Sequence, residues 1–98
     1  MDAERLVRRL RAATIVHRKA KDLLRAGVLP NLPADNIHVA KDLAKVKNGE
    51  LLSPVLLVRG QLDSGIPLTV ADGYHRICAS YHLAEDAVIP CRIVDSSE

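Results

Sequence analysis

Aromatic side chains are almost absent from this chain. Its 98 residues include no Trp and no Phe, and the only two tyrosines are Tyr74 and Tyr81. Leu, Val, Ile and Ala must therefore fill the core. Sheets that bind single-stranded nucleic acid by stacking bases need several exposed rings, so the composition argues against a base-stacking platform.

Cysteines and long apolar runs are also scarce. Cys78 and Cys91 are too few to form a disulfide scaffold. The first 27 residues lack the apolar core of a signal peptide, and no apolar run is long enough to span a bilayer. We therefore expect a cytoplasmic protein with reduced thiols and no membrane partner.

Charge is distributed unevenly. Residues 1–27 contain eight Lys or Arg against three Asp or Glu, whereas residues 28–98 contain six against nine. A basic segment of this kind can contact nucleic acid, an acidic partner or a second copy of the chain, although a solvated amphipathic helix is the simpler interpretation. The candidate nucleic-acid contacts are Arg5, Arg8, Arg9, Arg11 and Arg18.

The spacing of apolar residues predicts the elements. A helix is expected over residues 3–26, broken near residues 13–14 and capped by Gly27, followed by an irregular segment up to Pro33. A second helix is expected over residues 37–48, with Asp35 or Asn36 as its N-cap. Three strands are expected, at residues 54–58, 67–71 and 89–94.

Two details of these strands follow from their flanking residues. The polar segment 60–65 joins the first two strands, which favours a β-hairpin. Pro90 lacks a backbone donor and indicates an edge position or a strand start for the third strand. A helix over residues 73–84 separates the second and third strands, with Ile77, Tyr81 and Ala84 on its core side.

The most informative stretch is the junction from the second strand to this third helix. We interpret Asp72 mainly as the helix N-cap, with a general-base role as the less favoured alternative. Gly73 fits a tight turn or a close approach. His75 and Arg76 then lie in the first helical turn, beside free backbone N–H groups. This combination predicts a site for a phosphate or carboxylate.

Two other patterns involve histidine and lysine side chains on the helices. His75, Cys78 and His82 share one side of the third helix, and His38 or Cys91 could complete a metal site. No recognised ligand spacing accompanies them, so we expect no metal centre. On the helix over residues 37–48, the side chains that form a basic face are His38, Lys41 and Lys45.

The order of these motifs resembles the ParB/sulfiredoxin superfamily, often labelled ParB-like nuclease domain. The resemblance covers about residues 35–95 and is carried by Pro54-Val-Leu-Leu-Val58, Asp72-Gly-Tyr-His-Arg76 and Ile89-Pro90. It implies an α+β domain with a small mixed sheet, preceded by a basic helical arm over residues 1–34. Together the two parts, 1–34 and 35–98, are expected to form one compact domain.

The resemblance also implies a ligand. Members of the superfamily bind a nucleotide phosphate at the turn that corresponds to Gly73–Arg76, with help from the preceding helix. The implied binding residues are Gly73, Tyr74, His75, Arg76, Lys41 and Lys45. A nucleoside triphosphate with Mg²⁺ is the expected cofactor, and Asp72 or Glu50 is a candidate catalytic acid or base.

This chain departs from the family at several points. Sulfiredoxins carry their reactive cysteine where this chain has Tyr74, and a phenol cannot form the sulfur intermediate, so sulfiredoxin activity is disfavoured. Partition proteins have Glu there and a long DNA-binding region afterwards. This chain ends at Glu98, so we expect no such region.

Three functions remain open from the sequence. The first is a nucleotide- or phosphate-binding module, with phosphoryl transfer or nucleotide hydrolysis as the reaction if it is an enzyme. The second is a DNA-associated protein that binds through its basic arm. The third is an inactive interaction module, for which a homodimer is one arrangement.

Overall fold

The computed structural model describes residues 3–61 and 66–95. It is an α+β fold in which helices and strands alternate irregularly along the chain. The elements are α1 (Ala3–Ala12), β1 (Ile15–Lys19), α2 (Ala20–Ala26), α3 (Ile37–Lys47), β2 (Val55–Gln61), β3 (Ile66–Asp72), α4 (Tyr74–Leu83) and β4 (Val88–Asp95).

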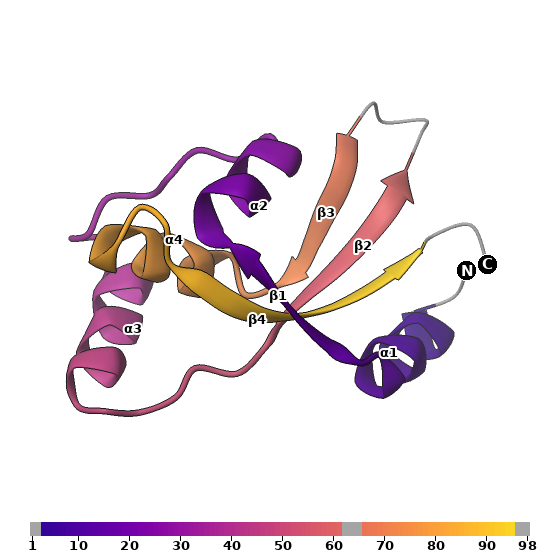
Figure 1. Cartoon of the computed structure of the whole chain (residues 1–98), viewed down its shortest axis with the longest axis horizontal. Helices are drawn as coiled ribbons and strands as arrows, with labels where there is room; N and C mark the ends of the chain where they lie inside the picture. Colours follow the sequence, from indigo (N-terminus) through magenta and orange to yellow (C-terminus); the bar gives the residue numbers. More distant parts are fainter. Residues whose placement is uncertain (1–2, 62–65, 96–98) are drawn as a thin grey trace.

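The four strands form one mixed sheet in the order β1-β4-β2-β3 (Figure 1). β1 runs antiparallel to β4, and β2 runs antiparallel to β3, while β2 and β4 are parallel. The crossover between these parallel strands includes α4. The expected mixed sheet is therefore confirmed, and so is the β2–β3 hairpin; residues 62–65 of its expected turn lie outside the described residues.

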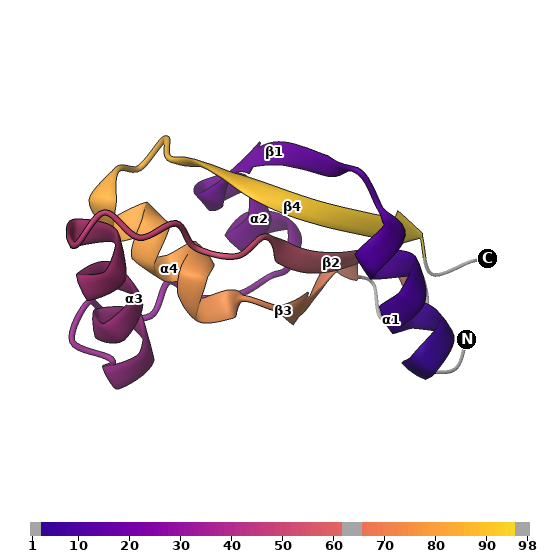
Figure 2. The same ribbon diagram turned by 90° about the horizontal axis from the view of Figure 1, so that it is seen from below.

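Side chains alternate between the two faces of the sheet, and a different set of helices covers each face. On β2, Val55 and Leu57 belong to the main core, which α2, α3 and α4 share. Val58 faces the other way and packs with Leu10 of α1 and with Val94 in a smaller cluster. Figures 1 and 2 show α3 and α4 together at one end of the molecule and α1 at the other.

The prediction of a helix over residues 3–26 is wrong at residues 15–19. They form β1, which pairs with residues 88–92 of β4, so the helical pattern is split into α1 and α2. Ile15 and Val16 are β-branched and favour an extended backbone, and the ladder with β4 satisfies their backbone groups. The basic segment thus contributes an edge strand to the sheet.

The start of α4 corrects a second expectation. Gly73, not Asp72, is the N-cap residue, with φ of 105°, and no side chain caps this helix. The helix spans Tyr74–Leu83. Its buried side extends over residues 77–80, while Tyr81 is half-buried and Ala84 is exposed. Gly73 begins the helix because it packs closely against Val55 of β2.

β4 as a whole is a central strand and not an edge strand, although its first residues are paired on one side only. The strand start expected at Pro90 is confirmed: β4 begins at Val88, and its pairing with β2 begins only at Cys91. At Pro90 the strand has a neighbour on the β1 side alone, where Pro90 lies opposite His17. The missing N–H of proline therefore leaves the β2–β4 ladder intact.

α3 matches its prediction closely. It spans Ile37–Lys47, and the Asn36 side chain accepts hydrogen bonds from the backbone N–H of His38 and Val39 at 3.0 and 3.2 Å. Asn36 is therefore the N-cap, as one of the two predicted alternatives. Val39 is fully buried against the main core, and α3 packs mainly on α4.

Candidate functional site

The β3–α4 junction depends on a close approach between two backbone segments. A Cβ atom on Gly73 would lie 2.6 Å from Cγ1 of Val55, the first residue of β2. With φ of 105°, Gly73 also has a backbone conformation that other residues rarely adopt. Glycine is therefore required here by packing against β2, whether or not a ligand binds.

Arg76 ties the junction to the chain segment that leads into β2. Its guanidinium donates to the carbonyl oxygens of Ser53 and Pro54 at 3.0 and 2.8 Å, and to the Asp72 carboxylate at 2.8 Å. The Arg76 side chain is 19% exposed. These bonds use three of its five N–H groups, so Arg76 is held in place while part of its cation still faces solvent.

A polar cavity of about 240 Å³ opens next to Arg76, and we call it the α3–α4 cavity. It lies between the C-terminal half of α3, the segment before β2 and the first turn of α4. Two cations and two carboxylates share its wall. The lining residues are Asp42, Lys45, Glu50, Leu51, Leu52, Ser53 and Arg76.

Of the predicted binding residues, the structure brings Lys45 and Arg76 together at this cavity. His75 faces elsewhere: its ring lies against His38 of α3, with 4.7 Å between ring centroids. Tyr74 stacks beside His75, and the Tyr74 hydroxyl donates to the Pro30 carbonyl. Lys41 is exposed and is not among the lining residues.

Two of the five candidate metal ligands, Cys78 and His82, hold a loop. The Cys78 thiol accepts a hydrogen bond from the Leu32 N–H at 3.4 Å, and Nε2 of His82 lies 2.6 Å from the Leu32 carbonyl oxygen. Cys78 and Cys91 are both buried free thiols. Within residues 3–61 and 66–95, no three His, Cys, Asp or Glu residues are arranged to hold a metal ion.

Two polar residues of this cavity, Asp42 and Ser53, were not predicted from the sequence. Asp42 and Lys45 are three apart on α3, so helical spacing places them on neighbouring positions of one face, and this was the available signal. Ser53 contributes through its backbone, because its carbonyl accepts from Arg76. No residue-type pattern reveals a contact of that kind.

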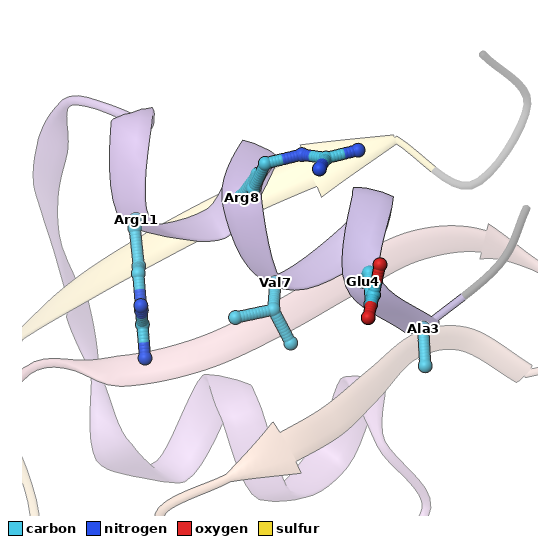
Figure 3. Close-up of a pocket in the computed structure, with 5 residues that line it drawn as sticks. All are labelled: Ala3, Glu4, Val7, Arg8 and Arg11. Carbon is cyan, nitrogen blue, oxygen red and sulfur yellow. The ribbon is translucent and has the colours of Figure 1, made fainter.

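A second hollow, of about 370 Å³, lies on the exposed side of α1, where Figure 3 shows Val7 and Arg11 on one side of the helix and Arg8 directed away from them. Its lining residues are Ala3, Glu4, Val7, Arg8 and Arg11. Some of the candidate nucleic-acid contacts are engaged within the protein. Arg9 donates to the Asp95 carbonyl and Arg18 to the His17 carbonyl, each at 2.9 Å.

Comparisons with family models, with curated proteins and with solved structures gave no match to this chain. Among the helices in residues 3–61 and 66–95, none combines the length and apolar character needed to cross a bilayer.

Proposed function

We propose that this protein binds the phosphate groups of a nucleotide in the α3–α4 cavity. The observation that carries the proposal is the convergence of Lys45 and Arg76 on one polar cavity from two separate helices. Arg76 is already oriented by Asp72 and two carbonyls, so little side-chain entropy is lost when it engages an anion. The resemblance of Gly73–Arg76 to the ParB/sulfiredoxin turn supports the same ligand.

The carboxylates of the cavity favour a magnesium-bound phosphate over a bare anion. Asp42 and Glu50 would repel an unaccompanied phosphate, but carboxylates are suitable ligands for Mg²⁺ on a triphosphate. Pockets that enclose a whole drug-sized ligand measure about 300–1,000 Å³. At about 240 Å³, the cavity fits the phosphates, and the nucleoside would extend outside it.

If the protein is an enzyme, phosphoryl transfer or nucleotide hydrolysis is the reaction that suits this site. Lys45 and Arg76 would stabilise the charge that develops on the transferred phosphoryl oxygens. Glu50 lines the cavity and is the better candidate base. Asp72 is the less suitable one, because its carboxylate accepts a hydrogen bond from Arg76 and serves to position it.

The test is a thermal-shift screen with ATP, CTP, GTP, ADP and pyrophosphate, each with and without Mg²⁺. Lys45→Ala is the informative variant, because Arg76→Ala would also remove the bonds to Ser53 and Pro54. Lys47→Ala is its matched control, a lysine on the same helix that does not line the cavity. A ligand at about 100 times its dissociation constant adds about 2.7 kcal/mol of stability.

We expect one nucleotide to raise the melting temperature by several degrees in the parent and in Lys47→Ala, and Lys45→Ala to lose most of that shift. An equal shift in both lysine variants would place the ligand elsewhere. No shift with any compound would refute nucleotide binding and favour the inactive interaction module, whose homodimer would be detected by sedimentation.

DNA binding through α1 is the second candidate, and the exposure of Arg5, Arg8 and Arg11 favours it. Contacts to backbone phosphates release counterions, so the affinity for a duplex would fall steeply between 50 and 200 mM salt, by a factor on the order of tenfold or more. Arg8→Ala/Arg11→Ala would reduce that salt dependence, whereas Lys45→Ala would not. Fluorescence anisotropy with a labelled duplex separates the two functions.

A further inference from the structure

Two of the four histidines in this chain meet in space although they lie 37 positions apart in sequence. His38 of α3 and His75 of α4 have ring centroids 4.7 Å apart, with 41° between the ring planes. The two rings are therefore tilted and not stacked face to face. The contact lies where α3 packs on α4, outside the wall of the α3–α4 cavity.

The separation of the rings suits two imidazoles on one metal ion. A bond of about 2.0–2.1 Å from zinc to the imidazole nitrogen puts each ring centre about 3.2 Å from the metal. Two such rings that subtend about 90–110° at the metal have centres about 4.5–5.2 Å apart. The observed 4.7 Å lies within that interval, and each ring can rotate about its metal–nitrogen bond, so the tilt of 41° is compatible with it.

Both rings are attached to well-fixed backbone. His38 is the second residue of α3, and its own N–H donates to the Asn36 cap at 3.0 Å. His75 is the second residue of α4, beside Tyr74, whose hydroxyl is bonded to the Pro30 carbonyl. Ligands on packed helices need little backbone reorganisation to bind, so the two helices already hold the rings within reach of one metal ion.

We propose that His38 and His75 form a two-imidazole site for a divalent transition metal such as Zn²⁺ or Ni²⁺. Neutral imidazole nitrogen suits Zn²⁺, Ni²⁺ and Cu²⁺, whereas Mg²⁺ and Ca²⁺ prefer oxygen ligands. Among the described residues no third His, Cys, Asp or Glu completes the set. The remaining coordination positions would therefore carry water or an incoming ligand, as in open rather than structural zinc sites.

The experiment uses the full chain without a polyhistidine tag and titrates it with ZnCl₂ or NiCl₂ by calorimetry at pH 7.5. We expect about one metal ion per chain and at least a tenfold loss of affinity in His38→Ala and in His75→Ala. His17→Ala is the matched control, because His17 is an exposed histidine that lies opposite Pro90 on β1, whereas the pair lies on α3 and α4. MgCl₂ should bind with no dependence on either histidine.

A second measurement does not depend on variants that might lose their fold. Paramagnetic Ni²⁺ should broaden the imidazole NMR signals of His38 and His75 and spare those of His17. Equal broadening of all histidine signals, or Zn²⁺ affinity that is unchanged in both His38→Ala and His75→Ala, would overturn the proposal. So would the absence of Zn²⁺ binding at 1 mM metal. None of these outcomes bears on nucleotide binding at Lys45.

Discussion

At the scale of single residues, the end of α2 contains a strained backbone conformation. The Leu29 N–H donates to the Leu24 carbonyl at 2.9 Å and the Val28 N–H to the Arg25 carbonyl at 3.1 Å. These two bonds define a Schellman motif. Its left-handed position is Val28, with φ of 53°, while Gly27 stands one residue earlier with φ of −82°. A β-branched residue is poorly suited to that conformation.

We therefore predict that Val28→Asn stabilises the protein. The left-handed conformation costs an ordinary L-residue about 1–2 kcal/mol, and asparagine tolerates it better. Little packing is lost, because Val28 is 69% exposed. The free energy of unfolding should rise by about 1 kcal/mol, which corresponds to a melting temperature about 4–8 °C higher in a domain of this size. Urea denaturation and calorimetry would measure it.

The end of α3 provides the matched control. The same pair of hydrogen bonds occurs there, from Glu50 to Lys45 and from Gly49 to Val46, and the left-handed residue is Gly49 with φ of 81°. No atom lies within 4 Å of a Cβ built on Gly49. Gly49→Ala should thus destabilise by about 1 kcal/mol through its backbone alone. A Val28→Asn variant no more stable than the parent would contradict the strain argument.

At the scale of elements, α4 holds the loop between α2 and α3 with one stripe of side chains. Tyr74, Cys78 and His82 follow one another at intervals of four residues, so they share a face of the helix. Tyr74 donates to the Pro30 carbonyl, while Cys78 and His82 contact the N–H and carbonyl of Leu32. The loop is thereby fixed without a strand or helix of its own.

This arrangement predicts a local effect of Cys78→Ala on hydrogen exchange. The variant removes the acceptor of the Leu32 N–H, so that amide should exchange faster than the loss of global stability explains. Cys91→Ala is the control, because it deletes an equally buried thiol that donates to the Ile89 carbonyl instead. Equal exchange rates at Leu32 in both variants, after correction for global stability, would show that the thiol does not hold the loop.

The elements also show what sequence could and could not predict. α3, β2 and β3 were predicted because their apolar patterns are clear and their ends carry strong signals, such as Asn36 at the start of α3. β1 was missed because four of its five residues are exposed, which erases the alternation that marks a strand. Its extended form depends on pairing with β4, a contact that local sequence does not encode.

The candidate site also has features that the sequence predicts and features that it does not. Arg76 was predicted from its charge at a helix start and Lys45 from the family resemblance, and the cavity contains both. The contact between His38 and His75 could not be predicted, since it depends on how α3 crosses α4. Likewise, the choice of Gly73 over Asp72 at the start of α4 depends on the approach of Val55, which belongs to another strand.

At the scale of the whole molecule, the core contains ionisable groups that it keeps neutral. Burial raises the pKa of the Cys78 and Cys91 thiols above their usual value near 9. Burial also raises the pKa of the Tyr74 hydroxyl above 10. All three groups therefore release their protons at lower pH in the unfolded chain than in the native protein.

These groups make the native protein less stable at alkaline pH. Below pH 8 both states keep these protons, and the free energy of unfolding does not depend on them. As the pH rises above 9, the unfolded chain loses thiol protons that the native protein retains, so stability falls, by at most about 1.4 kcal/mol per pH unit for each such thiol. In urea denaturation, the free energy of unfolding of the double variant Cys78→Ala/Cys91→Ala should fall less steeply between pH 9 and 10.5 than that of the parent. An identical slope in parent and variant would mean that neither thiol is kept neutral by the fold.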